Sequence, residues 1–256
     1  MIYWNGCSFV RGMEIKNRPD DIFANIVSQH FNQPWWDNAK VGGSNDRIMR
    51  TTTEDMYLKP AKLAIIIWSG LNRFEFLSHN PKSRYPGGVW RSAVWVTHRF
   101  NKKTLEIDPS SEVHFHPELT REQWNGLQGY ATRIRNMRSN LISSLHNMLA
   151  VKHMLELKGI PYLFYNMSDG QWLPSKETLN EERWEGANNL WQTEHFKLDD
   201  YLELLPHMKE QAFYDMCKEA GVEFGPRDHP LEDGHQLMAK RIIEDIYDKG
   251  FDKLFS

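Results

Sequence analysis

Four short segments carry the side chains that are best suited to chemistry. Three of them follow strand candidates, and the fourth lies in a loop before the last helix candidate. They are Gly6-Cys7-Ser8, Gly42-Gly43-Ser44-Asn45, Gly70-Leu71-Asn72 and Asp228-His229-Pro230. Together they supply a hydroxyl, glycine amides, a carboxamide and an imidazole. Those groups are the nucleophile, the oxyanion donors and the general base of an acyl-transfer site, so the sequence predicts such a site if the fold brings them together.

The elements that must position these segments alternate between short apolar strands and helices. The strand candidates are Met1–Trp4, Asp37–Val41, Lys62–Trp68 and Ile160–Asn166. The helix candidates are Ile22–Phe31 with Asp20-Asp21 as N-cap, a helix through Arg47, Ile48 and Arg50 to about Tyr57, Arg121–Lys158, Tyr201–Ala220 either broken or entered at Pro206, and His235–Tyr247. This alternation predicts a three-layer α/β/α fold whose central sheet is mostly parallel and covered by helices on both faces.

The carboxyl ends of parallel strands share one edge of a sheet, so we expect the first three segments to converge there. The loop before the last helix would add His229. Two segments, at about 79–120 and 168–200, show no clean hydrophobic period and are rich in aromatic residues. We interpret them as insertions into a single domain that spans residues 1–256. The first insertion is expected to contain a short hairpin near Val94–Phe100.

Charge argues against general nucleic-acid binding. The chain has 31 Lys and Arg residues against 34 Asp and Glu residues, which gives a formal net charge of -3. A global positive field that would concentrate phosphates is therefore missing. The basic stretch Arg133, Arg135 and Arg138 is the only support for a nucleic-acid role, and its spacing also suits a solvated helix face.

Cysteine and apolar content point to a cytoplasmic protein. Cys7 and Cys217 alone form neither a disulfide framework nor a four-thiolate zinc site. The longest apolar run, Leu63–Trp68, is far below the ~20 residues that span a bilayer, so no membrane partner is expected. His114 and His116 have a spacing that suits a metal on a strand, but packing is the simpler interpretation without a nearby Cys. We expect neither a metal nor an organic cofactor.

The four segments together resemble the SGNH (GDSL-type) hydrolase superfamily, in which they stand in the same order. The resemblance implies Ser8 as the nucleophile of the first block and His229 as the base of the fifth. It implies that the Gly43 backbone amide and the Asn72 side chain stabilise the oxyanion, as the second and third blocks do. It also implies a flavodoxin-like fold and ester hydrolysis without a cofactor.

Sequence variants in three of the blocks are similar to uncharacterised SGNH-like proteins of tailed bacteriophages. These variants are Gly-Gly-Ser-Asn-Asp-Arg-Ile, Trp-Ser-Gly-Leu-Asn-Arg-Phe-Glu and His-Pro-x-x-x-Gly-His. The resemblance covers residues 1 to about 75 and 205–247, and the two insertions resemble no known family. A phage origin would place the protein in the cytoplasm of an infected bacterium.

The fifth block departs from the superfamily pattern Asp-x-x-His-Pro, in which the aspartate orients the base. Pro226 stands where that aspartate is expected. Asp228 is the nearest acid, directly adjacent to His229, and Glu223 is a second candidate. A backbone carbonyl could also hold the imidazole. Because an orienting acid controls the histidine tautomer, this departure bears on activity more than on fold.

Simpler roles remain open for each of these residues. Ser8 could cap the segment that follows it, Asn72 could close its turn, and His229 could be a surface histidine. Cys7 is expected to pack as a small residue, and His235 to pack at a helix start near the site. Arg73 and Glu75 are expected to form a structural ion pair near the strand end rather than to bind substrate.

Two functions are consistent with this reading. The first is an esterase that acts on a small-molecule or glycan ester, such as an O-acetyl group on a carbohydrate. The second is a catalytically weak or inactive binding protein, or a virion-associated phage protein, that keeps the same fold. The sequence does not determine the oligomeric state.

Overall fold

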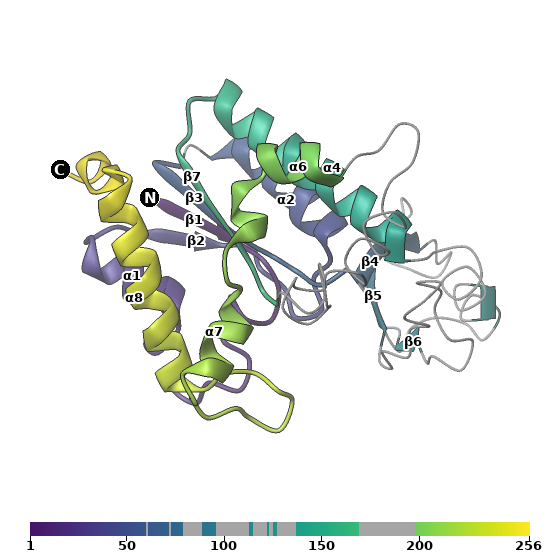
Figure 1. The fold of residues 1–256 in the computed structure, drawn as a ribbon, viewed down its shortest axis with the longest axis horizontal. Helices are drawn as coiled ribbons and strands as arrows, with labels where there is room; N and C mark the ends of the chain where they lie inside the picture. Colours follow the sequence, from purple (N-terminus) through teal and green to yellow (C-terminus); the bar gives the residue numbers. More distant parts are fainter. Residues whose placement is uncertain are drawn as a thin grey trace.

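A parallel four-stranded sheet forms the centre of the molecule (Figure 1). The computed structural model describes residues 1–59, 61–71, 73–78, 89–95, 113–114, 122, 125–126, 137–168 and 198–256. The strand order is β2-β1-β3-β7, and all three neighbouring pairs are parallel. The strands are β1 (Ile2–Asn5), β2 (Trp35–Asp37), β3 (Leu63–Trp68) and β7 (Tyr162–Asn166). The predicted parallel sheet is therefore confirmed.

Helices cover both faces of this sheet (Figure 1). On one face lie α1 (Phe23–His30), α7 (Phe213–Glu219) and α8 (Glu232–Asp248). On the other lie α2 (Asn45–Leu58), α4 (Met137–Leu157) and α6 (Leu198–Leu204). Two 3-10 helices, η2 (Pro206–Lys209) and η3 (Phe251–Leu254), complete the described helical segments. The three-layer α/β/α fold class is thus confirmed.

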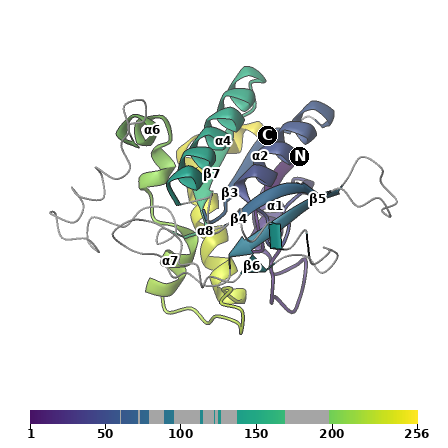
Figure 2. The same cartoon turned by 90° about the vertical axis from the view of Figure 1, so that its right-hand side faces the viewer.

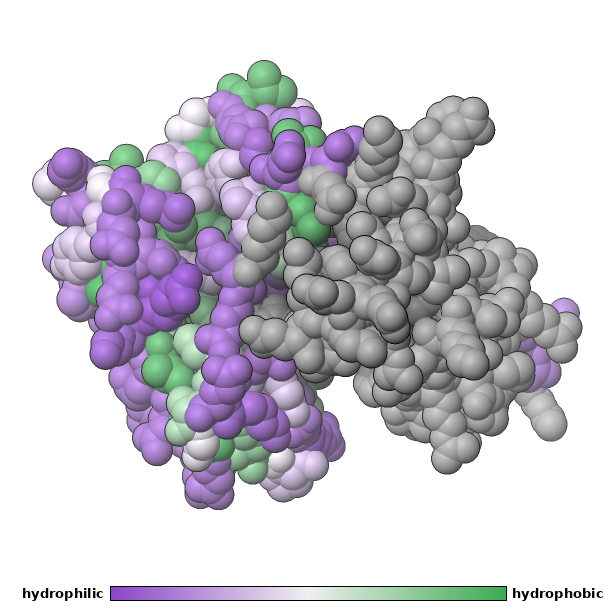
Figure 3. Space-filling view, viewed as in Figure 1, coloured by the Kyte–Doolittle hydropathy of each residue, from purple (hydrophilic) through white to green (hydrophobic). Residues whose placement is uncertain are grey.

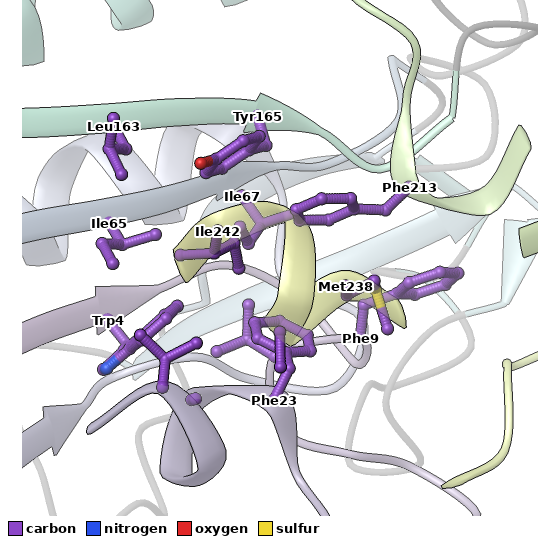
Figure 4. Close-up of a cluster of buried hydrophobic side chains, with 14 of the residues drawn as sticks. Trp4, Phe9, Phe23, Ile65, Ile67, Leu163, Tyr165, Phe213, Met238 and Ile242 are labelled. Carbon is purple, nitrogen blue, oxygen red and sulfur yellow. The ribbon is translucent and has the colours of Figure 1, made fainter. Parts of the chain in front are cut away.

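The central strand β3 contributes side chains to both hydrophobic cores of the fold. All six of its residues are fully buried. Leu63, Ile65 and Ile67 contribute to the core shared with α1 and α8, part of which Figure 4 shows. The alternate residues contribute to the core shared with α2 and α4. Complete burial of a Leu or Ile side chain stabilises the fold by about 1.5–3 kcal/mol, so this strand fixes both layers.

A second, antiparallel sheet lies beyond the carboxyl end of β3 (Figures 1 and 2). It consists of β4 (Arg73–Ser78), β5 (Val89–Trp95) and β6 (Val113–His114). β4 pairs antiparallel with β5. The hairpin expected near Val94–Phe100 stays a prediction, because most of that segment lies outside the described residues. The alternating Arg-Phe-Glu-Phe sequence that follows the third turn is the period-2 signal for β4. Residues 96–100 lie outside the described residues.

Two predicted boundaries differ from the structure. The second strand is Trp35–Asp37 rather than Asp37–Val41, although Asn38 N still donates to Trp4 O at 3.0 Å. The expected cap Asp20-Asp21 is wrong, because the N-cap residue of α1 is Ile22 and its side chain makes no capping bond. Instead, the Phe23 amide donates to His235 Nδ1 at 3.2 Å. A distant helix therefore caps α1.

The remaining helices follow the prediction more closely. The expected break at Pro206 is confirmed, because η2 separates α6 from α7. The last helix begins a few residues before the predicted His235. Most of the segment 121–136, predicted as the start of the long helix, lies outside the described residues. Among the described helices, none combines the length and the apolar character needed to cross a membrane. The described surface in Figure 3 is mostly hydrophilic.

Candidate active site

Ser8 and His229 meet although they are 221 positions apart in the chain. The Ser8 hydroxyl oxygen lies 2.7 Å from His229 Nε2. Ser8 follows β1, and His229 lies in the loop between α7 and α8. These two loops lie side by side in Figure 1. The structure thus brings together the two residues that the sequence indicates as candidate nucleophile and candidate base.

A tight turn after β1 holds Ser8. A side chain at Gly6 would place its Cβ 2.6 Å from Val10 Cγ2 and 2.9 Å from the Ile67 carbonyl oxygen, so only glycine fits there. The buried Asn5 side chain accepts a hydrogen bond from the Gly6 amide at 2.8 Å. Its amide group is bonded in turn to residues of α2. The start of the nucleophile turn is therefore fixed by packing on two sides.

The loop that carries His229 is held by its own hydrogen bonds. Gly225 N donates to His229 O at 2.8 Å, and Leu231 N donates to Glu223 O at 3.0 Å. The His229 ring packs against Phe9, with 5.4 Å between the ring centroids. These contacts hold the His229 imidazole beside Phe9, the residue that follows Ser8.

The Glu14 carboxylate contacts the ring nitrogen of His229 that faces away from Ser8. Its Oε2 atom lies 3.2 Å from His229 Nδ1, and both side chains are largely buried, with 14% and 12% exposure. The Arg227 amide donates to both carboxylate oxygens, at 3.0 and 3.1 Å. Glu14 also has a positive φ of 73°, a conformation that costs a non-glycine residue energy and that often occurs at functional sites.

Gly225 makes room for this carboxylate. A Cβ on Gly225 would lie 2.7 Å from the Glu14 carboxyl carbon. The sequence pattern did not indicate Glu14, because Glu14 lies outside the four segments and contacts His229 only in the folded chain. A signal was available, since Glu14 is the only acidic residue between Ser8 and Asp20.

Asp228, the acid that the sequence places next to His229, binds other residues and not the imidazole. Its carboxylate accepts hydrogen bonds from the Tyr214 hydroxyl at 2.6 Å and from Lys218 Nζ at 3.2 Å. Its backbone has a positive φ of 60°. The other candidate, Glu223, is exposed. Adjacent residues in a loop point in different directions, which explains why the neighbour in sequence is not the neighbour of Nδ1.

The environment of His229 favours its neutral form. Burial, the largest cause, lowers the pKa of His229 below its ordinary value. The Glu14 carboxylate raises the pKa in part, and the charge of Arg73 lowers it again. A neutral imidazole that donates from Nδ1 to Glu14 has a free lone pair on Nε2. That lone pair can accept the Ser8 proton, as a general base must.

Gly43 packs directly against the nucleophile turn. A Cβ at this position would lie 3.0 Å from the Gly6 carbonyl oxygen and 2.9 Å from the Lys40 carbonyl oxygen. The Gly43 amide itself donates to Lys40 O at 2.8 Å, so in this conformation it closes its own turn. Within the described residues, the Ser8 amide has no acceptor.

The third turn is described only in part. Asn72 lies outside the described residues, so its side chain is not placed. Ser69, just before the third turn, is joined to Asn45 of the second turn by a reciprocal pair of hydrogen bonds. Asn45 Nδ2 donates to Ser69 O at 2.9 Å, and Ser69 N donates to Asn45 Oδ1 at 2.8 Å. Asn45 is buried and therefore joins two of the turns that surround the site.

Two residues near the site, Cys7 and His235, have packing roles. Cys7 is fully buried with its Sγ 3.3 Å from Met167 Sδ. His235 is almost fully buried, and burial lowers its pKa to about 4. The expected Arg73–Glu75 ion pair is wrong, because Arg50 reaches Glu75 from α2 with two hydrogen bonds of 2.9 and 2.8 Å.

Comparison with solved structures finds esterases. An esterase EstA from Pseudoalteromonas sp. has 8% identity, covers 96% of each chain and gives a TM-score of 0.48. A putative lipolytic protein of the G-D-S-L family from Desulfitobacterium hafniense has 9% identity, a TM-score of 0.44 and coverage of 95% of this chain and 97% of its own.

A third similar structure comes from a rumen bacterium. It is an acetyl xylan esterase (Est2A) from Butyrivibrio proteoclasticus with 12% identity, a TM-score of 0.48 and coverage of 98% of this chain and 64% of its own. No family model and no curated protein matches the sequence. The similarity to phage proteins stays a prediction.

Proposed function

We propose that this protein is a serine ester hydrolase of the SGNH type, with Ser8 as nucleophile, His229 as general base and Glu14 as the acid that orients the base. One observation carries the proposal. His229 contacts the Ser8 hydroxyl through Nε2 at 2.7 Å and the Glu14 carboxylate through Nδ1 at 3.2 Å. A serine, a histidine and a carboxylate in this order form the arrangement that activates a hydroxyl for acyl transfer.

The reaction would proceed in two halves. His229 Nε2 accepts the Ser8 proton while Oγ attacks the acyl carbon, and the carbonyl oxygen becomes the oxyanion. The imidazolium then donates the proton to the departing alkoxide, which leaves an acyl-Ser8 ester. Water, deprotonated by the same imidazole, attacks this ester, and the acid is released with Ser8 restored. Glu14 stabilises the imidazolium in both halves.

The oxyanion donors in this proposal are the Ser8 amide, the Gly43 amide and the Asn72 side chain. The Ser8 amide has no acceptor in the described part of the chain, so it is available to the substrate. The Gly43 amide must first exchange its bond to Lys40 O for one to the substrate. Each donor that reaches the oxyanion contributes about 2.7–4 kcal/mol to transition-state stabilisation.

The substrate class in this proposal is an ester of a small molecule or a carbohydrate, and an O-acetyl group is the simplest case. A 4-nitrophenyl acetate assay tests the proposal. The purified protein is expected to hydrolyse this ester, and Ser8→Ala to reduce the rate to that of buffer without unfolding. Ser256→Ala, which removes an exposed serine far along the chain, is the matched control. Activity retained in Ser8→Ala would overturn the proposal.

A second function is favoured by one specific observation. The Gly43 amide is bonded to Lys40 O in this conformation and offers no hydrogen bond to an oxyanion. The fold could therefore serve as a binding or virion-associated module that does not turn over esters. That function predicts no ester hydrolysis by the wild-type protein and specific binding to an acylated glycan or a protein partner.

A further inference from the structure

Arg73 is a cation beside the candidate active site that has only neutral partners in the described part of the protein. It is the first residue of β4, directly after the third turn. Its Nη1 atom donates to Ser69 Oγ at 2.8 Å and lies 3.5 Å from the Gly43 carbonyl oxygen. Its Nε atom is buried and has no hydrogen-bond partner. A partly buried charge without a counter-charge is costly and usually has a ligand or a partner.

The carboxylate expected to neutralise Arg73 is engaged elsewhere. Glu75 lies two residues along the same strand, but Arg50 binds both of its oxygens, through Nε at 2.9 Å and Nη2 at 2.8 Å. This pair shows how the Nε–Nη2 edge of a guanidinium binds a carboxylate in this protein. The same edge of Arg73 has no acceptor among the described residues.

The position of Arg73 puts this charge close to the reacting atoms. It contacts the carbonyl of Gly43, and Gly43 packs against the Gly6 carbonyl and the Cα atom of Cys7 in the nucleophile turn. Its charge also contributes to lowering the pKa of His229. The guanidinium therefore lies on the side of the site where the second and third turns meet the nucleophile.

Glu14 and Asp228, two described acidic residues at the site, already have partners. The Glu14 carboxylate is bound by His229 and by the Arg227 amide. Asp228 is bound by Tyr214 and Lys218. No carboxylate among the described residues therefore pairs with the Arg73 guanidinium.

We propose that Arg73 binds a carboxylate carried by the substrate close to the scissile ester, so that the protein prefers anionic esters over neutral ones. This inference rests on the proposed function and narrows its substrate class to acylated molecules that bear an acidic group. A guanidinium suits this task because it stays charged and offers paired donors to the two oxygens of a carboxylate.

A pair of esters that differ in one charge tests this selectivity. The probes are 4-acetoxybenzoate and its neutral methyl ester, methyl 4-acetoxybenzoate. The measured quantity is the ratio of kcat/KM for the anionic ester to kcat/KM for the neutral one. We expect Arg73→Gln to lower this ratio at least tenfold and Arg73→Lys to restore part of it.

Arg18→Gln is the matched control, because it removes the same charge from an exposed side chain that donates only to the Arg11 carbonyl oxygen among the described residues. We expect this control to change the ratio less than twofold. A ratio that Arg73→Gln leaves unchanged, while both esters are still cleaved by Ser8, overturns the role of Arg73 and leaves the proposed function intact.

Binding of 4-hydroxybenzoate, measured by calorimetry, tests carboxylate binding by Arg73 independently of ester turnover. The wild-type protein is expected to bind it at least tenfold more tightly than Arg73→Gln, and thermal melts check that the variant is folded. Equal or undetectable binding by both proteins contradicts the anion site. If the wild type binds this anion through Arg73 but cleaves neither ester, the proposed function fails and the site remains.

Discussion

The Glu14 carboxylate lies 3.2 Å from His229 Nδ1, on the side of the imidazole opposite to Ser8. This contact joins the loop after β1 to the loop before α8. The Arg227 amide, from the second loop, donates to the same carboxylate. Ser8 and Glu14 therefore come from one loop, and His229 comes from the other.

The first prediction concerns which acid orients the base. Glu14→Gln is expected to lower kcat by roughly 10²- to 10⁴-fold, because an amide supports the wrong tautomer and does not stabilise the imidazolium. Asp228→Asn is the matched control and is expected to lower kcat less than about threefold, since Asp228 contacts Tyr214 and Lys218 instead. Steady-state kinetics on 4-nitrophenyl acetate measure both. The reverse order of effects would restore Asp228 to this role.

The second prediction tests the space that Gly225 leaves for Glu14. Gly225→Ala would put a methyl group 2.7 Å from the Glu14 carboxyl carbon, so the carboxylate must move away from His229. We expect kcat to fall at least tenfold with a smaller change in KM. Gly126→Ala, where a Cβ meets nothing within 4 Å, is the control and should behave like wild type. Equal kcat in both variants would show that the carboxylate position does not matter.

The third prediction concerns the pH dependence of activity. The base works only when neutral, so kcat/KM should fall as the pH drops through the pKa of His229. Burial lowers that pKa below the ordinary histidine value of 6.5, so the midpoint of the pH profile is expected below pH 6.5. Glu14→Gln removes the partner that stabilises the imidazolium and should move the midpoint lower still. A midpoint above pH 6.5 in the wild type contradicts this account.

The fourth prediction concerns stability in acid. Burial lowers the pKa of His235 from 6.5 to about 4, and its Nδ1 accepts the Phe23 amide hydrogen bond. The unfolded chain takes up this proton near pH 6.5 and the folded chain only near pH 4, so stability is lost as the pH falls between those values. The loss from this residue is about 3 kcal/mol, given 1.36 kcal/mol for each unit of pKa difference.

Urea unfolding at pH 7 and pH 4 measures this loss. His235→Gln keeps an acceptor for the Phe23 amide but removes the titrating group. We expect the free energy of unfolding to change less with pH in this variant than in the wild type. An equal pH dependence in both proteins would mean that His235 does not carry the effect.

Much of the fold could be predicted because a buried parallel strand leaves a strong local signal. Leu63–Trp68 is short, apolar and followed by small residues, and the structure buries it on both faces. Ser8 and His229 could be singled out for a similar reason, since both stand in turns where the chain changes direction. These signals depend only on nearby residues.

The rest of the site depends on contacts that no local pattern encodes. Glu14 reaches His229 across 215 positions, and its carboxylate fits only because Gly225 lacks a side chain. The cap of α1 comes from His235 on another helix and not from the preceding aspartates. Tertiary contacts overrode the local signals in each case.

Labelling with a fluorophosphonate probe tests the central claim most directly. The probe forms a covalent adduct with a serine that a neighbouring base activates, and mass spectrometry of peptides locates the adduct. The account predicts an adduct on Ser8, with the rate of labelling strongly reduced in His229→Gln and absent in Ser8→Ala. A folded wild-type protein that forms no adduct, or forms it on another serine, would contradict Ser8 as the activated nucleophile.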